Sequence, residues 1–208
     1  MKTVYIVLVK AHTGLGAVAR KITGYPYTHV AVSLDRSMED FISFSRRRHF
    51  FPFDAGFTHE SRSSYAFGDH RSFKAKIFSL PVSDEAYLRI TDYISECEKD
   101  PKRLFNIFSM ATMPLIGGFR IWHADNCMSF VSRVIQLSGA VKMDRSYWRY
   151  AIKDLDRLLA KDLFFEGKIF RSSPPDPEYM EPFELGAFLK EMFSLIGRLT
   201  YRLFFNRP

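Results

Sequence analysis

Residues 121–132 read IWHADNCMSFVS and place Cys127 at the start of a predicted helix, directly after two residues that cap helices well. Either Asp125 or Asn126 is the predicted N-cap, and Gly139 marks the predicted end of the helix. A cysteine at a helix amino terminus faces unpaired backbone N–H groups and the positive end of the helix dipole, which favour a thiolate. Cys127 is therefore a candidate nucleophile, and a purely structural role as the first core residue of the helix stays open.

The second cysteine, Cys97, lies in a predicted helix that begins after Ser83. Tyr87, Ile90, Ile94 and Cys97 follow one another at helical spacing and form an apolar stripe. We therefore expect Cys97 in the core. Two cysteines are also too few for a disulfide framework.

Composition indicates a well-packed globular domain. The chain has 208 residues, of which 47% are hydrophobic and 16% aromatic, including 21 Phe. The apolar run before Lys10 is shorter than the core of a signal peptide and is predicted to be a strand. The sequence also lacks a run of roughly 18 apolar residues, the length of a membrane span. We therefore expect a cytoplasmic protein.

The formal net charge of +7 invites an anionic partner, and Arg46, Arg47 and Arg48 are the densest basic cluster. These arginines are followed by aromatic residues, but they are not accompanied by a nucleic-acid-binding motif. We interpret them as part of a solvated loop and expect no nucleic-acid partner.

Four β-rich stretches predict a small antiparallel sheet, because the second and third are joined by a short turn. A short helix over residues 15–23 ends at Gly24, and another helix is predicted from Pro101 to residue 113, with Pro114 and Gly117 ending it. Residues 46–72 are polar, aromatic and irregular, and predict a long surface loop. The four predicted strands cover residues 3–9, 28–34, 41–45 and 73–80.

A cysteine nucleophile needs a base, and His29 is the only one of six histidines on a predicted strand, a rigid element that could hold an imidazole. His123 is close to Cys127 in sequence but precedes the helix cap. The histidines are scattered without metal-ligand spacing, so we expect no metal site and no cofactor.

Three stretches together resemble a known superfamily: ITGYPYTHVAVSLD at residues 22–35, FISFSRRR at 41–48 and NCMSFVSRVI at 126–135. They are similar to the circularly permuted papain-like cysteine hydrolases of the NlpC type, which include lecithin retinol acyltransferase-like enzymes. In that permuted branch the strand histidine precedes the helix cysteine, as His29 precedes Cys127. The resemblance covers roughly residues 3–140.

The resemblance implies an α+β fold, in which a small antiparallel sheet packs against the cysteine-bearing helix. It also implies that Cys127 is the nucleophile and His29 the general base and acid. A third polar residue orients the imidazole from the neighbouring strand, and Ser43 is the position that matches best. A serine departs from the stronger acceptors often found there, and Glu39 and Asp35 are alternatives.

Two further residues are candidates for substrate or oxyanion binding. Tyr27 precedes His29 by two residues and faces the same side of the strand, so its hydroxyl could donate to an oxyanion. Asn126 lies beside the nucleophile. A core role for the tyrosine remains an equal alternative.

The carboxyl-terminal region predicts three parts: a domain over residues 1–172, a proline-rich linker over 173–182 and an amphipathic helix over 183–208. The helix must bury its apolar face against its own domain, a second subunit or an anionic bilayer. If the helix lies on an anionic bilayer, Arg198, Arg202 and Arg207 near its end would face the lipid headgroups. The protein would then be peripheral at a membrane.

The first functional hypothesis is a cytoplasmic hydrolase of peptides or amides that works through a Cys–His pair and an acyl-enzyme thioester. The second is a lipid acyl hydrolase or acyltransferase at a membrane surface. The third is a non-catalytic binding module that retains the fold, for which the serine at position 43 is the supporting feature.

Overall fold

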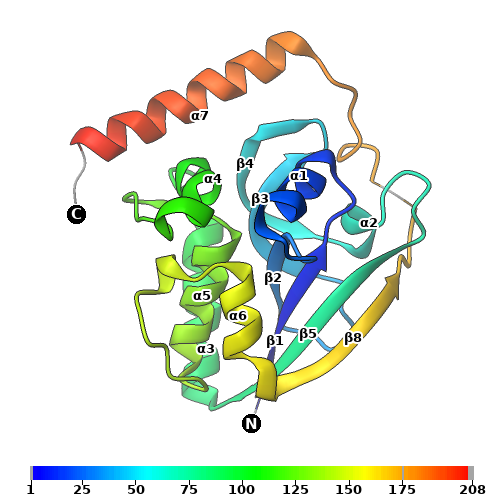
Figure 1. Cartoon of the computed structure of the whole chain (residues 1–208), viewed down its shortest axis with the longest axis vertical. Coiled ribbons are helices and arrows are strands. Elements are labelled where there is room, and N and C mark those ends of the chain that lie inside the picture. Colours follow the sequence, from blue (N-terminus) through cyan, green and yellow to red (C-terminus); the bar gives the residue numbers. More distant parts are fainter. Residues whose placement is uncertain (1, 175, 206–208) are drawn as a thin grey trace.

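The structure, a computed structural model, describes residues 2–174 and 176–205. It has an α+β architecture around a six-stranded sheet in which all neighbouring strands are antiparallel, in the order β4-β3-β2-β1-β5-β8. Figure 1 shows helices α3 and α5 packed together beside this sheet and α7 running across one end of the molecule. The sheet strands are β1 (Lys2–Lys10), β2 (His29–Ser33), β3 (Phe41–Arg48), β4 (Phe51–Glu60), β5 (Ser72–Val82) and β8 (Leu163–Phe170).

The remaining elements are the helices and one short parallel pair of strands. The helices are α1 (Gly14–Thr23), α2 (Arg62–Tyr65), α3 (Asp84–Lys99), α4 (Ile107–Ile116), α5 (Cys127–Ser138), α6 (Ile152–Leu158) and α7 (Leu185–Phe205), with 3-10 turns at Tyr147–Arg149 and Ala160–Asp162. The parallel pair joins β6 (Leu104–Phe105) to β7 (Ala124–Asp125).

Strand β1, in the interior of the sheet, is buried on both faces, which explains why it is an unbroken apolar run. Alternate residues of β1 belong to two separate clusters: Ile6 and Leu8 to the larger core, and Val7 and Val9 to a smaller one on the opposite face. The larger core contains the buried side chains of α3 and α5. The sheet therefore presents one face to the cysteine-bearing helix.

The predicted strands and helices of the first third of the chain and around Cys127 are confirmed. The first predicted helix ends at Gly24, which adopts a left-handed conformation with a φ of 62°. Ser83 caps α3 by accepting the N–H of Ala86, and Gly139 ends α5 with a φ of 64°. Cys97 is buried in the core, as its helical spacing predicts.

The predicted surface loop over residues 46–72 is wrong. Strand β3 continues to Arg48 and turns back at once into β4, whose Glu60 pairs with Phe41. Pro52 and Gly56, residues that are uncommon inside strands, obscure the alternation of Phe51, Phe53 and Phe57 in the sequence. The hairpin adds an edge strand and brings Glu60 back to the start of β3.

The helix predicted to begin at Pro101 begins later. Residues 104–105 form β6, and Asn106 caps α4 by accepting the N–H of Ser109. Pro114 lies inside the last turn of the helix rather than ending it, and Gly117 forms the carboxyl-terminal cap. These residues form a strand rather than a helix because the backbone N–H groups of Leu104 and Asn106 donate to the carbonyls of His123 and Asp125.

Helix α7 docks on its own domain through one face. Leu195 and Leu199 are buried in the main core, and the ring of Phe188 lies edge-on to Phe53 of β4 at a centroid distance of 5.3 Å. Arg202, one of the arginines considered for membrane contact, is also buried and donates to the backbone carbonyls of His123 and Lys102. Arg207 lies outside the described residues.

The segment predicted as a linker, residues 173–182, is tied to the β3–β4 hairpin in its described part. Tyr179 is buried, its carbonyl accepts the N–H of His49, and Glu181 pairs with Arg48 at 2.9 Å. The arginine cluster that the sequence placed in a solvated loop thus holds this segment. Among the described helices none has the length and apolarity required to cross a membrane.

Candidate active site

Cys127 is the first residue of α5, and the residues just before it fix its position. Asn126 accepts the N–H of Ser129, and Ser129 Oγ in turn accepts the N–H of Asn126, which forms a capping box. Asp125 accepts hydrogen bonds from Ser129 Oγ and from Arg103, both at 2.8 Å. The head of α5 is therefore held by buried polar contacts and by the β6–β7 pair.

His29 is the first residue of β2 and contacts both a carboxylate and the candidate nucleophile. Its Nε2 lies 2.8 Å from Oε2 of Glu60, and the side chain of Cys127 is near enough to raise the pKa of the imidazole. The side chains of His29 and Glu60 are 13% and 6% exposed and Cys127 is 5% exposed, so the three groups are shielded from bulk water.

Glu60 is held in turn by Tyr65 of α2, whose hydroxyl donates to the same carboxylate oxygen at 2.9 Å. The Tyr65 ring is packed edge-on against Phe41 and Phe73 at centroid distances of 5.2 and 5.0 Å. Ser45 is another hydrogen-bond partner of the carboxylate. These contacts fix the acid against the imidazole, as the orienting residue of a nucleophile–base–acid arrangement requires.

The environment favours a charged imidazolium. Burial of His29 opposes the charged form, but the carboxylate of Glu60 and hydrogen bonds to Cys127 and Glu60 outweigh it and raise the pKa of His29 to about 10. Burial likewise opposes the charged carboxylate of Glu60. The imidazolium and the hydrogen bonds from His29, Tyr65 and Ser45 nevertheless lower the pKa of Glu60. Both shifts have the same cause, since the two opposite charges face each other in a shielded site.

Ser43, the residue predicted to orient His29, has a different role. Its side chain is fully buried, and its hydroxyl donates to the backbone carbonyl of Val30 at 2.9 Å. Glu60 occupies the predicted place instead, although β3 lies between β4 and β2 in the sheet. Extending the antiparallel register of Val32 with Ile42 places His29 opposite Ser45, whereas Glu60 is paired with Phe41 at the other end of β3.

The predicted oxyanion and substrate residues are also used elsewhere. The hydroxyl of Tyr27 donates to Glu166 of β8 at 2.7 Å, and its side chain is buried in the core. The side-chain oxygen of Asn126 is the helix cap described above. The Tyr27 hydroxyl and the Asn126 side-chain oxygen thus each have a partner within the fold.

The alternative orienting residues lie apart from His29. Asp35 accepts a hydrogen bond from the N–H of Ser37, and Glu39 is paired with Arg62 at 3.2 Å. His123 faces Asp100, with Nδ1 3.1 Å from Oδ2. Glu60 and Tyr65 were missed because they fall in the segment predicted as a loop. The alternating phenylalanines of β4 were the available signal for a hairpin that ends at Glu60.

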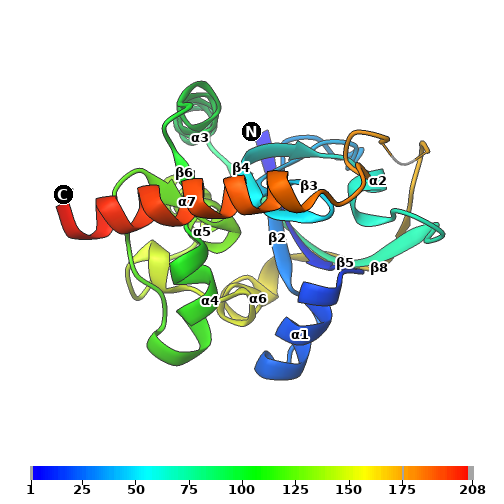
Figure 2. The ribbon, with the colours of Figure 1, turned by 90° about the horizontal axis from the view of Figure 1, so that it is seen from above.

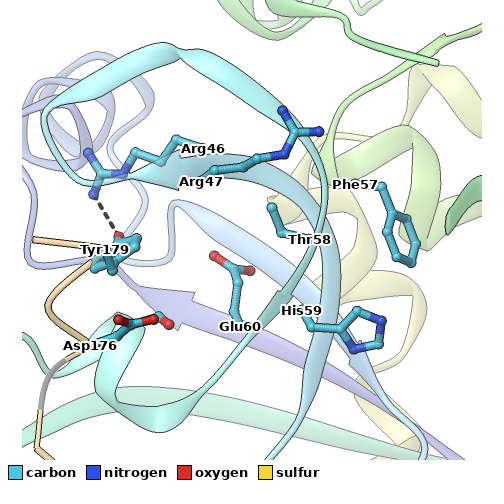
Figure 3. A pocket seen from close by; sticks show the side chains of 9 residues that line it. Arg46, Arg47, Phe57, Thr58, His59, Glu60, Asp176 and Tyr179 are labelled. Atoms are coloured by element: carbon cyan, nitrogen blue, oxygen red, sulfur yellow. Dashed lines mark hydrogen bonds between the residues drawn. The ribbon is translucent and has the colours of Figure 1, made fainter. Parts of the chain in front are cut away.

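Glu60 also lines a cavity of about 260 Å³. Figure 3 shows the Glu60 carboxylate at its centre, with Arg46 and Arg47 on one side and Asp176 and Tyr179 on another. The cavity is lined by charges of both signs, and the Arg46 guanidinium is already bonded to Tyr179 and to the carbonyl of His49. We therefore assign it no ligand.

The His29–Glu60 pair predicts a pH dependence of folding stability. The raised pKa of His29 contributes stability that is fully present below its usual value of 6.5 and is lost as pH rises through about 10. The lowered pKa of Glu60 contributes stability present above 4.5 and lost on acidification. We expect the difference in unfolding free energy between wild type and His29→Gln/Glu60→Gln to be largest between those limits and to fall toward pH 10. Urea titrations across pH measure it, and a difference that stays constant would contradict the charged pair.

Comparison of this chain with protein-family models, with curated proteins and with solved structures gives no match.

Proposed function

We propose that this protein is a cysteine-dependent hydrolase of amide or ester bonds, built on a permuted papain-like fold of the NlpC type. The observation that carries the proposal is the 2.8 Å bond between His29 and the buried carboxylate of Glu60, at an imidazole whose pKa the side chain of Cys127 also raises. A thiol, an imidazole and a buried carboxylate in this order form a nucleophile, a base and an orienting acid. The order in the chain, with the strand histidine before the helix cysteine, supports the permuted arrangement.

In the first half-reaction, Sγ of Cys127 attacks the carbonyl carbon of the substrate and a C–S bond forms. The carbonyl electron pair moves onto oxygen and gives a tetrahedral oxyanion. As the oxyanion collapses, the C–N or C–O bond breaks, and the imidazolium of His29 gives its proton to the leaving amine or alcohol. A thioester on Cys127 and a neutral His29 remain.

In the second half-reaction, His29 takes a proton from water, and the resulting hydroxide equivalent attacks the thioester carbonyl. Collapse of the second oxyanion breaks the C–S bond and releases the carboxylic acid. The thiolate and the imidazolium are thereby regenerated. Glu60 stays ionised throughout and stabilises the imidazolium.

Backbone N–H groups replace the predicted side chains as oxyanion donors. The N–H of Ser129 is capped by Asn126, and that of Phe130 bonds the Asn126 carbonyl. The N–H groups of Cys127 and Met128 precede these and have no acceptor within an α-helix. They stand beside the nucleophile, where the charge of a tetrahedral intermediate develops.

Glu60 also weakens the argument for a non-catalytic module. That interpretation rested on the weak acceptor at position 43, whereas the imidazole faces a carboxylate. A lipid acyl hydrolase or transferase remains a second candidate, because α1, α4, α7 and strand β8 all present exposed apolar side chains.

The test is to mix the full chain with an activated phenyl ester and to follow phenolate release and intact protein mass together. We expect a burst of phenolate and an acyl adduct that maps to Cys127. The same adduct should be absent from His29→Ala. An unmodified Cys127 in folded wild-type protein, with amide, ester and thioester probes alike, would contradict the proposal.

A further inference from the structure

Helix α1 has an apolar stripe that faces solvent instead of the core. Leu15, Val18 and Ile22 follow one another at helical spacing and are 61%, 56% and 67% exposed. The inward side is Gly16, where an added Cβ would lie 3.2 Å or less from atoms of Thr13, Ala11 and Thr28. A surface helix normally turns its apolar side to the core. We therefore expect the exposed apolar stripe of α1 to contact a partner or a lipid surface.

The tip of α4 shows the same property. Leu115 and Ile116 at its carboxyl end are 84% and 57% exposed, and the helix contains no charged residue. The loop behind the tip is fixed, since Ser109 Oγ accepts the N–H of Phe119 and Asn106 donates to the Phe119 carbonyl. The two exposed aliphatic side chains are thus presented by an ordered turn.

The two apolar helices protrude from the same side of the molecule. Figure 2 shows α1 and α4 extending together, away from α7, with α6 between them. In the chain, α1 lies between β1 and His29, and α4 lies between β6 and the β7 strand that precedes Cys127. Both helices are therefore inserted in the connections that lead into the candidate catalytic residues.

The segments that contain α1 and α4 carry charge of one sign, whereas α6 between them has Asp154 and Asp156 beside Lys153 and Arg157. Residues 10–24 contain Lys10, Arg20 and Lys21 without an acidic residue, and residues 104–124 contain Arg120, again without one. Helix α7 has the larger apolar exposure, but its segment also contains Glu184 and Glu191, and its buried Arg202 is bonded to backbone carbonyls. Apolar tips on two cationic segments match an anionic lipid surface.

We propose that α1 and the tip of α4 dock this protein on an anionic bilayer, with Leu15, Val18, Ile22, Leu115 and Ile116 entering the interface. The proposal goes beyond the hydrolase activity and does not depend on it. Docking in this way brings the connections that hold His29 and Cys127 toward the lipid. A second copy is disfavoured as the occupant, because two such faces would bring cations against cations.

Vesicle flotation of the full chain tests this docking. The probes are phosphatidylcholine vesicles and vesicles with about 30% phosphatidylglycerol, at low and raised salt. We expect binding to the anionic vesicles only, weakened by salt. Val18→Ser/Ile22→Ser/Leu115→Ser should lower the bound fraction at least about tenfold, since three exposed aliphatic side chains are lost.

Two matched variants keep the outcome decisive. Phe193→Ser/Phe204→Ser removes side chains of α7 that are 67% and 63% exposed, and should leave binding unchanged. Lys21→Gln/Arg120→Gln should weaken binding to anionic vesicles. Lack of wild-type binding, or binding lost in the α7 variant and kept in the α1–α4 variant, would overturn the proposal. A wild-type dimer that the α1–α4 variant converts to monomer, without vesicle binding, would overturn it in favour of a second copy.

Discussion

Replacing Cys127 by alanine is expected to abolish the phenolate burst and the acyl adduct, and to lower turnover of any substrate by about 10⁴-fold or more. The substitution removes Sγ, the atom to which the acyl group is transferred. It deletes one small side chain at the head of a helix whose capping box involves Asn126 and Ser129. The fold should therefore persist, which circular dichroism and thermal melting check.

The matched control is Cys97→Ala, which removes the other thiol. Burial raises the pKa of Cys97 to about 12, so this thiol is neutral and shielded at neutral pH. Turnover and labelling of the Cys97→Ala protein should equal those of wild type. Activity that survives Cys127→Ala but not Cys97→Ala would reassign the nucleophile.

The second large effect is expected for Glu60→Gln, which keeps the shape and a hydrogen-bond acceptor but removes the charge. Burial lowers the pKa of His29, and the Glu60 carboxylate is the main group that raises it. Removing the negative charge of Glu60 therefore lowers the pKa of His29. Less imidazolium is then available to protonate the leaving group. We expect kcat/KM to fall by about 10²-fold or more and its alkaline limb to move from near pH 10 to lower pH.

Ser43→Ala is the control for this experiment, because the sequence predicts that Ser43 orients His29, the role that Glu60 has in the structure. Its hydroxyl donates to the Val30 carbonyl, so the variant should lose some stability and keep the pH profile. A profile that shifts in Ser43→Ala and not in Glu60→Gln would remove Glu60 from the site.

The local parts of this site are readable from the sequence. Asn126 as a cap, Cys127 at the helix head and His29 on a strand all follow from short-range patterns that the structure confirms. They are readable because helix caps and strand alternation are set by neighbouring residues.

The long-range parts are not readable in this way. Glu60 meets His29 across an intervening strand, which depends on the register of the β3–β4 hairpin. Likewise, the burial of Arg202 depends on backbone carbonyls that β6 and the segment before α5 bring together. Neither contact has a signature at fixed sequence spacing.

The central claim is that His29 activates the thiol of Cys127, and the rate of Cys127 alkylation by iodoacetamide at neutral pH tests it most directly. The wild-type rate should be well above that of His29→Ala, with Cys97→Ala behaving as wild type. A rate that is identical in wild type and His29→Ala would contradict this claim and leave Cys127 a structural residue.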